Sequence, residues 1–455
     1  MIWSSFLAAA LLLQGTSATP IKRATDTISK RAAKAKFTVK DTKAFAGATE
    51  LKTSNSVLSL KTAGVKAKGS SALHNAVRAS TGRTLLIPSE EGAGYSVNIT
   101  FGGKTFEVIL DTGSSDLWLA ESGVKCVDVD MDPVATAECG FGPLASASFQ
   151  DGAIANENFN ISYGDGEFLT GVLGYENVGV ANITVDKQEV ALVNYAYWEG
   201  DNVTSGLMGF AYPTLTSAYR GTDASVDNEN TTAVQYTNWI FSAIDQGLID
   251  PMFSLAIERG SNGGGGQLAL GGLPSLAFNH TFTSTPLKII ELTPHAVEAK
   301  NYSYYTIIPD GFLLSGEEET YYGFQEFSED PSTTYPVIVD SGTTLVYLPE
   351  RVADDVNALF DPPSVYIEEE GVYENYCDAV PPTFAIRING TDFYISGAEL
   401  LLTGELGYDE YTGGCVTGVQ PMDGIYILGD VFLKNVIAVF DIGASEMRFA
   451  PHEKY

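Results

Sequence analysis

Two short strings in this sequence could supply carboxylates for acid–base chemistry. Residues 108–115 and 337–344 each run through three aliphatic residues, then Asp, a small hydroxyl residue, Gly and another hydroxyl residue. The aliphatic run predicts a buried strand, and Gly permits a sharp turn directly after it. Each string therefore predicts one carboxylate, Asp111 or Asp340, at the end of a buried strand. Two such loops facing each other would let the carboxylates share one proton and activate water without a metal.

An ordinary turn is the alternative interpretation of either string. Asp and Ser bond to their own backbone, so a strand followed by Asp-Ser/Thr-Gly is also a common turn. Here the pattern occurs twice, each time behind an aliphatic triplet. The repetition favours the paired-carboxylate interpretation over two unrelated turns.

The elements around both strings are predicted to be strands with few helices. Residues 95–101 alternate and 105–110 return as a second strand, and 158–171 form a hairpin whose tip is 163–166. The best helical stretches are 234–246 and 350–360. The two halves echo each other, because each Asp string is followed by an aliphatic pair and Gly, at 207–209 and 427–429. We therefore expect a mostly β protein built from one duplicated lobe, with lobes at 85–275 and 276–455.

The amino-terminal segment is predicted to be processed. Residues 6–13 are apolar, Gln14-Gly15 ends the run and small residues follow, which is typical of a secretory signal peptide cleaved near Ala18. The apolar run is too short to span a membrane, and the carboxyl end has no lipid-anchor signal. The sequence predicts a secreted protein, with a vacuolar location as the alternative, and no membrane anchor.

Charge is divided sharply along the chain. Residues 1–83 contain 14 Lys/Arg and 3 Asp/Glu, whereas the rest contains 12 Lys/Arg and 54 Asp/Glu. The basic part shows no strand alternation apart from Phe37-Thr38-Val39, so residues 19–84 are interpreted as a basic prosegment separate from the main fold. A solvated basic tail without an inhibitory role is the alternative. The acidic body lacks a basic stripe, which argues against nucleic-acid partners.

Export to an oxidising compartment implies disulfides and glycans. The four cysteines allow three pairings, and we favour Cys126 with Cys139 and Cys377 with Cys415 because each bridge then stays within one half of the chain. Neither the cysteines nor the four histidines have metal-ligand spacing, so no metal and no cofactor is expected. The candidate glycosylation sites are Asn98, Asn160, Asn182, Asn202, Asn230, Asn279, Asn301 and Asn389.

With these motifs, residues 92–449 resemble the pepsin family of aspartic endopeptidases, of the secreted fungal kind. The resemblance rests on the two Asp strings with Trp118, Tyr-Gly-Asp-Gly at 163–166, both aliphatic-Gly strings, and Cys377 with Cys415. It implies two β-rich lobes joined by a shared sheet, with a long cleft between them. The chain departs from pepsin in a longer loop between Cys126 and Cys139, in Ser341, where pepsin has Thr, and in lacking the third disulfide.

The resemblance also implies roles for individual residues. Asp111 and Asp340 would be the catalytic pair, with polypeptide substrates lying extended in the cleft and the prosegment acting as an inhibitor of a monomeric enzyme. The residues expected to support the pair are Thr112, Gly113, Ser114, Ser341, Gly342 and Thr343. Those expected to form the flap or contact substrate are Tyr163, Gly164, Asp165, Trp118 and Thr344.

Within this set, Ser114 and Thr343 would orient the carboxylates, and Thr112 with Ser341 would cross-link the two loops. Tyr163 would lie on a closing flap with its hydroxyl held by Trp118. A catalytically silent binding or inhibitor protein on the same fold is the alternative function.

Overall fold

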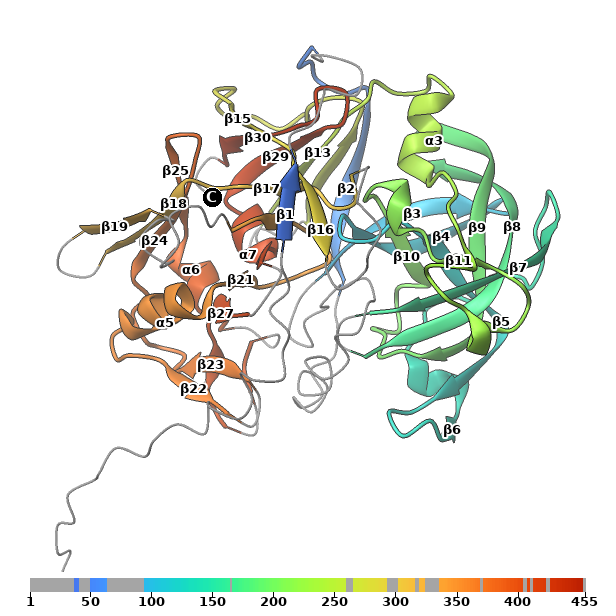
Figure 1. Cartoon of the computed structure of the whole chain (residues 1–455), viewed down its shortest axis with the longest axis horizontal. Helices are drawn as coiled ribbons and strands as arrows, with labels where there is room; N and C mark the ends of the chain where they lie inside the picture. The colour runs from blue at the N-terminus through green and yellow to red at the C-terminus, as the bar shows by residue number, and fades with distance from the viewer. Residues whose placement is uncertain are drawn as a thin grey trace, which may run out of the picture. The chain divides into compact units, whose positions relative to one another are not determined.

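The computed structural model describes residues 37–40, 50–63, 94–163, 166–258, 265–292, 302–315, 319–323, 335–368, 371–403, 407–409, 412–422 and 426–452. All of these ranges lie in the compact unit Lys36–Tyr455. The unit is mostly β, as the sequence predicts, and its strands are labelled in Figure 1. None of the helices in these ranges has the length and apolar character needed to cross a membrane.

The element bounds follow chain order. Up to residue 270 the strands are β1 (Phe37–Lys40), β2 (Ser56–Ala63), β3 (Gly94–Phe101), β4 (Lys104–Asp111), β5 (Leu117–Val127), β6 (Pro133–Val134), β7 (Ala153–Ser162), β8 (Phe168–Val180), β9 (Ile183–Tyr197), β10 (Gly206–Gly209), β11 (Ala218–Arg220), β12 (Ala233–Val234), β13 (Phe253–Ile257) and β14 (Gly266–Leu270). Beyond it they are β15 (Thr283–Pro286), β16 (Ile289–Leu292), β17 (Thr306–Ile307), β18 (Gly311–Ser315), β19 (Glu319–Gly323), β20 (Val337–Val339), β21 (Val346–Leu348), β22 (Val365–Ile367), β23 (Val372–Asn375), β24 (Thr383–Ile388), β25 (Thr391–Ile395), β26 (Cys415–Val416), β27 (Val419–Pro421), β28 (Tyr426–Leu428), β29 (Val436–Asp441) and β30 (Glu446–Pro451). The helices are α3 (Trp239–Asp245), α5 (Glu350–Ala358), α6 (Gly397–Leu400) and α7 (Asp430–Leu433), with 3-10 turns η1 (Thr136–Cys139), η2 (Pro213–Leu215) and η3 (Ala224–Val226).

Two groups of four strands in the two halves have the same order and directions. In the first half β4 pairs with β10 in parallel, β10 with β5 antiparallel, and β5 with β9 in parallel. In the second half β20 pairs with β28 in parallel, β28 with β21 antiparallel, and β21 with β27 in parallel. The internal duplication expected from the two Asp strings is therefore present in the strand pairing.

A large shared sheet connects strands from both halves. Its described order is β12-β11-β7-β8-β9-β5-β10-β4-β3-β2-β14-β13-β29-β30-β15. Aromatic rings pack beside it, with Phe253 stacked on Phe440 at 4.4 Å between ring centroids and Tyr305 edge-on to Phe440 at 4.7 Å. A second apolar cluster, in the first half, contains Trp118 and Phe159.

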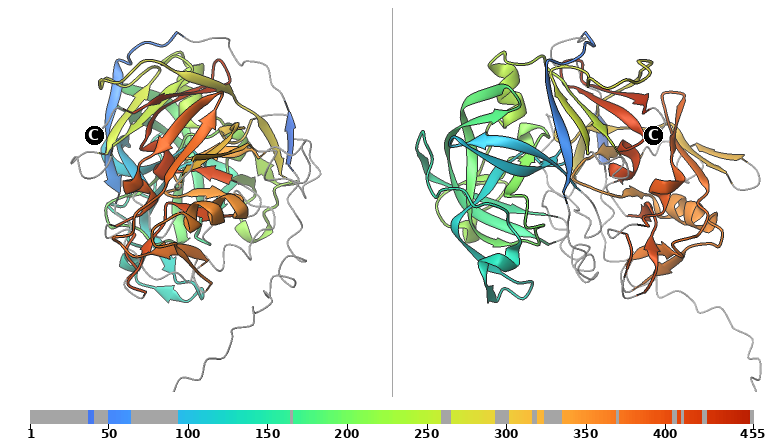
Figure 2. Two further views of the ribbon diagram at one scale, coloured as in Figure 1. Left: turned by 90° about the vertical axis from the view of Figure 1, so that its left-hand side faces the viewer. Right: turned by 180° about the vertical axis from the view of Figure 1, so that it is seen from behind.

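Strand β2 corrects the expectation that residues 19–84 stand apart from the main fold. β2 pairs antiparallel with β14 through Ser56–Leu60 and with β3 through Lys61–Ala63, and Figure 2 shows it beside these strands in the view from behind. Leu60 and Ala63 are buried in the core. The expectation is therefore wrong for residues 56–63, whose strand pairing comes from partners distant in sequence. Phe37-Thr38-Val39, the one part of the segment with strand alternation, lies in β1, which pairs with β16.

The predicted helices are present with shorter bounds. The stretch 234–246 contains only α3, because Val234 pairs with Ala218 in strand β12 and the helix starts after Asn238. The side-chain amide of Asn238 donates to the carbonyl of Ala211 at 2.8 Å. Tertiary pairing thus overrides the helical pattern at its beginning. The stretch 350–360 contains α5, which ends two residues earlier, at Ala358.

Candidate active site

Asp111 is the last residue of strand β4, which is buried at this end. Val108 and Leu110 are fully buried, and β4 runs parallel to β10, with Gly209 beside Asp111. A Cβ on Gly209 would lie 2.5 Å from the carbonyl oxygen of Ser114, so this position requires glycine. The first carboxylate oxygen of Asp111 accepts from the amide of Gly113 at 2.7 Å, and the second accepts from the hydroxyl of Ser114. Both oxygens are therefore oriented by the turn that follows the strand.

Strand β20 carries Asp340 in the same way. β20 runs parallel to β28, and a Cβ on the following Gly429 would lie 2.3 Å from the carbonyl oxygen of Thr343. The amide of Gly342 donates to one oxygen of Asp340 at 2.9 Å, and the hydroxyl of Thr343 donates to the other at 2.7 Å. The two carboxylates thus have equivalent sets of donors, from residues two and three positions further on.

The two Asp loops are bonded to each other. The hydroxyl of Thr112 donates to the carbonyl of Val339 at 3.2 Å and accepts from the amide of Ser341 at 2.9 Å. The hydroxyl of Ser341 donates to the carbonyl of Leu110 at 3.1 Å. All the side chains in this cross-link are buried. The relative position of the loops is therefore fixed by hydrogen bonds between the halves of the chain.

Burial and proximity make the two carboxyls hard to ionise together. Asp111 and Asp340 are each 1 % exposed. Burial raises the pKa of Asp111 well above its usual range, and the charge of Asp340 raises it further. Burial likewise raises the pKa of Asp340, while the amide of Gly342 and the hydroxyl of Thr343 oppose that rise. The pair therefore retains one proton over a wider pH range than two isolated carboxyls would.

Tyr163 and Trp118 meet beside this pair. The indole nitrogen of Trp118 donates to the Tyr163 hydroxyl at 2.8 Å, and both side chains are buried. Burial raises the pKa of Tyr163 well above its usual range, and the charge of Asp111 adds to the effect. Gly164 and Asp165, also predicted for the flap, lie outside the described residues. Thr344, predicted to contact substrate, is buried, and its carbonyl accepts from the amide of Val431.

Two buried carboxyls near the pair received no role in the sequence analysis. Asp430, the first residue of α7, has no hydrogen-bond partner for either carboxyl oxygen within the described ranges. Burial raises its pKa well above the usual range, with Lys434 opposing the rise and Asp340 adding to it. Asp116 accepts from the Tyr236 hydroxyl at 2.6 Å, and burial raises its pKa to about 6. The sequence signal for Asp430 was its place directly after the second aliphatic-Gly string.

The cysteines and the sequon asparagines are the other sites that the sequence predicted. Disulfides join Cys126 to Cys139 and Cys377 to Cys415, which is the local pairing that the sequence favoured. In the part of the chain that the structure describes, no group of three or more His, Cys, Asp or Glu side chains could hold a metal ion. Among the sequon asparagines, Asn160 is half-buried and Asn301 lies outside the described residues. The exposed ones are Asn98, Asn182, Asn202, Asn230, Asn279 and Asn389.

Comparisons with known proteins agree with this geometry. The family model for eukaryotic aspartyl proteases matches residues 94–452. A probable aspartic-type endopeptidase of Aspergillus fumigatus is 39% identical over 411 residues, covering 88% of each chain. Rhizopuspepsin of Rhizopus chinensis is 29% identical over 368 residues, covering 78% of each. The crystal structure of an aspartic proteinase from Irpex lacteus superposes with a TM-score of 0.57 at 18% identity, over 79% of this chain and 94% of that one.

Proposed function

Because this chain belongs to the eukaryotic aspartyl protease family, we propose that it is an acid endopeptidase in which Asp111 and Asp340 activate water. The observation that carries the proposal is the pair of buried carboxylates with matching amide and hydroxyl donors on cross-linked loops. An aspartic-type endopeptidase needs such a pair, since it has no covalent nucleophile.

The proposed chemistry follows from the shared proton. At acid pH the charged carboxylate takes a proton from a bound water, which attacks the scissile carbonyl carbon. The protonated carboxyl donates toward the carbonyl oxygen, giving a tetrahedral diol. The diol collapses when a proton reaches the leaving amine, so the peptide bond breaks and no acyl-enzyme forms. Two carboxyls that share one proton are a general property of aspartic proteases, and the proposal carries that property over to Asp111 and Asp340.

The test replaces each carboxyl by an amide of nearly the same shape. We expect Asp111→Asn and Asp340→Asn each to retain less than about one hundredth of the wild-type turnover on denatured globin at acid pH, because water activation is lost. Asp151→Asn, at an exposed position in the same lobe as Asp111, is the control and should digest globin like the wild type. A folded Asp111 or Asp340 variant with greater activity would refute the proposed roles. Wild-type protein without proteolytic activity would instead support the silent binding protein.

The substrate is proposed to be an extended polypeptide covered by the segment that begins at Tyr163. Closure of such a flap would exclude water from the reacting groups. Asp165 at its tip is proposed to favour a basic P1 side chain. Asp165→Ser should then weaken cleavage after Lys more than cleavage after Phe, whereas equal losses would assign Asp165 to the flap alone.

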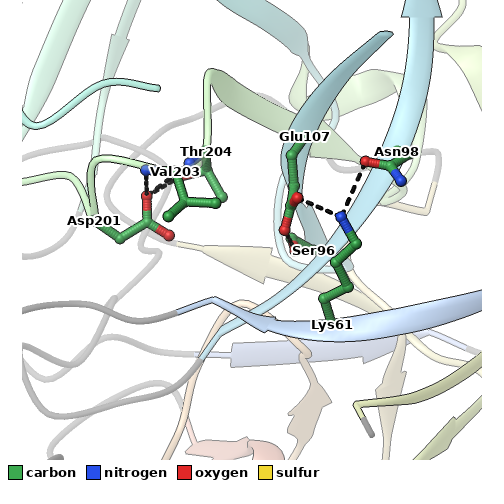
Figure 3. Close-up of polar contacts among 7 residues, drawn as sticks. All are labelled: Lys61, Ser96, Asn98, Glu107, Asp201, Val203 and Thr204. Carbon is green, nitrogen blue, oxygen red and sulfur yellow. Dashed lines mark hydrogen bonds and ion pairs between the residues drawn. The ribbon is translucent and has the colours of Figure 1, made fainter. Parts of the chain in front are cut away.

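The chain is further proposed to be secreted as a zymogen, with residues 1–18 removed as a signal peptide and 19–84 as the inhibitory segment. Two features support this proposal. The segment is basic while the rest of the chain is acidic, and β2 within it is anchored to body strands. Lys61 of β2 contacts Glu107 of β4 at 2.5 Å and the Asn98 side chain at 3.3 Å (Figure 3).

Acidification would weaken the attraction between the basic segment and the acidic rest of the chain, because protonated carboxyls no longer pair with Lys or Arg. The test is to express residues 19–455, hold the protein at neutral pH, and then acidify. We expect latent protein that becomes active as residues up to about Arg83 are removed. Full-length protein already active before cleavage would contradict the zymogen proposal and favour the solvated tail.

A further inference from the structure

A chain of aromatic rings leads from Tyr163, the proposed flap tyrosine, to Phe141, two residues after the first disulfide. Trp198, directly after β9, lies edge-on to Trp118 at 5.1 Å and to Tyr163 at 5.8 Å between ring centroids. Trp198 also stacks on Phe141, with centroids 6.3 Å apart and ring planes 7° from parallel, and Phe141 lies edge-on to Trp118 at 6.3 Å. Trp118 and Trp198 are 0 % and 7 % exposed. The rings therefore form a continuous packed path from Phe141 to Tyr163.

The backbone next to the first disulfide holds Phe141 on this path. Cys139, bonded to Cys126, ends the turn η1, and its carbonyl accepts from the amide of Gly200 at 2.9 Å. A Cβ on Gly140 would lie 2.3 Å from the carbonyl oxygen of Gly200, and a Cβ on Gly200 would lie 2.4 Å from that of Gly140. The two backbones thus touch on one side of Phe141, at a distance that only glycine permits.

The other side of Phe141 is fixed as well. The amide of Gly142 donates to the carbonyl of Thr204 at 2.8 Å. Thr204 is held by Asp201, whose carboxylate oxygen accepts from the amide of Val203, the amide of Thr204 and the Thr204 hydroxyl, at 2.9, 2.7 and 2.8 Å (Figure 3). Phe141 is therefore held between two backbone attachments to the segment that follows Trp198.

We propose that Phe141 is a positioning residue that sets the place of Tyr163 over the substrate by supporting Trp198. The inference rests on the proposed flap role of Tyr163. It makes the segment directly after Cys139 part of the apparatus that closes on a polypeptide.

The path of rings ends at Tyr163, whose backbone also forms the base of the proposed flap. Phe141 can therefore affect the flap and not only the packing of the apolar cluster. The amide of Tyr163 donates to the carbonyl of Glu167 at 2.8 Å, and the amide of Gly166 donates to the carbonyl of Tyr163 at 3.2 Å. Tyr163 is thus the base of the turn as well as the end of the aromatic path. Loss of ring area at Phe141 removes contacts from Trp198, and Trp198 then no longer confines the Tyr163 ring. A shift of Tyr163 therefore also moves the backbone bonds that it makes to Gly166 and Glu167.

The experiment compares two half-buried phenylalanines of the same half of the chain. Phe141→Leu removes the stack on Trp198, whereas Phe149→Leu alters a ring that packs on the other apolar cluster and against Gly174. The protein is the mature enzyme, and kcat, KM and the melting temperature are measured at acid pH with one peptide substrate. We expect Phe141→Leu to lower kcat/KM by about tenfold, chiefly in kcat, because flap contacts are completed on closure. The kcat/KM of Phe149→Leu should stay within about twofold of wild type, even if its melting temperature falls as much as that of Phe141→Leu.

Two further variants test the route through Tyr163. Phe141→Tyr keeps the stacking surface and should restore kcat/KM to within about twofold of wild type. The double variant Phe141→Leu with Tyr163→Phe should have nearly the same kcat/KM as Tyr163→Phe alone, because both substitutions act through Tyr163. Should Phe141→Leu fail to accumulate, Phe141→Met gives the same comparison. Additive losses, or equal losses in the two phenylalanine variants, would overturn the inference. Inactive wild-type enzyme would instead refute the proposed function.

Discussion

The hydroxyl of Thr112 accepts a hydrogen bond from the amide of Ser341 at 2.9 Å, although the residues are 229 positions apart. The same hydroxyl donates to the carbonyl of Val339. One side chain therefore satisfies two backbone groups of the opposite loop inside a buried site. This arrangement couples the geometry of the carboxylate pair to the association of the two halves of the chain.

Removal of the Thr112 hydroxyl should disturb both stability and activity. Thr112→Val leaves the buried amide of Ser341 without its acceptor, which costs about 1–3 kcal/mol of unfolding free energy. The carboxylates then lose their fixed spacing, and we expect kcat to fall by about tenfold or more. Urea unfolding and peptide cleavage measure the two effects. Thr105→Val, exposed on the same strand β4, is the control and should leave both quantities near wild type. Unchanged kcat in Thr112→Val would show that the cross-link is dispensable for catalysis.

If the chain is made as the proposed zymogen, the Lys61–Glu107 pair should affect how readily that zymogen is converted. Lys61→Met removes the contact between β2 and β4, so we expect conversion at a fixed acid pH to be about two- to fivefold faster, the range of a partly exposed ion pair. The measurement is the rate of loss of the full-length band. Lys52→Met is the matched comparison. The side chains of Lys52 and Asp250 are 59% and 44% exposed, so their ion pair is more exposed to solvent than the Lys61–Glu107 pair. A faster conversion in Lys52→Met than in Lys61→Met would contradict this assignment.

Stability of the folded enzyme should fall as the pH rises from about 4 to 7. The pKa of Asp116 is raised to about 6 by burial, and that of Glu189 to about 7 by burial and then by the charge of Glu157. Unfolded carboxyls have pKa values of about 4, so in this window the unfolded chain has released protons that the folded chain keeps. The free energy of unfolding therefore decreases with pH, by roughly 3 kcal/mol for Asp116.

Asp116→Asn should flatten that decrease, since an amide does not titrate. The measurement is the urea midpoint at pH 4 and at pH 7 for wild type, Asp116→Asn and the exposed control Asp151→Asn. We expect the control to follow the wild type. A pH dependence in Asp116→Asn as steep as in the wild type would show that Asp116 is already ionised in the folded protein at pH 4.

Among the sequons, Asn160 is predicted to be unoccupied while Asn182 and Asn230 carry glycans. The side-chain nitrogen of Asn160 donates to the carbonyl of Ala224 at 3.1 Å and to Asp227 at 3.0 Å, so both of its hydrogens are engaged. A glycan on that nitrogen would break this attachment of η3 to β7. Mass spectrometry of peptides from the purified protein measures occupancy at each site. A fully glycosylated Asn160 in active enzyme would refute the prediction.

Much of the site could be predicted from the sequence, because most of its residues lie in the two strings 108–115 and 337–344. Asp111 with Gly113 and Ser114, and Asp340 with Gly342 and Thr343, lie within three positions of each other, so turn chemistry alone predicts which donors orient each carboxylate. The internal duplication followed from the same repetition. Even the Trp118–Tyr163 contact followed from the family resemblance that these motifs carry.

What the tertiary structure decided depends on partners far apart in the chain. Strand β2 was hidden in a basic segment, because its pairing with β3 and β14 comes from strands about 30 and 200 positions away, and pattern reasoning sees only neighbouring residues. Sequence patterns also did not predict the burial of Asp430 without a hydrogen bond in the described ranges, or the stacking of Phe141 on Trp198. Burial and ring contact exist only once the strands have packed. The sequence by itself determined which carboxyls and donors form the site, and long-range packing decided which other groups lie around them and hold them in place.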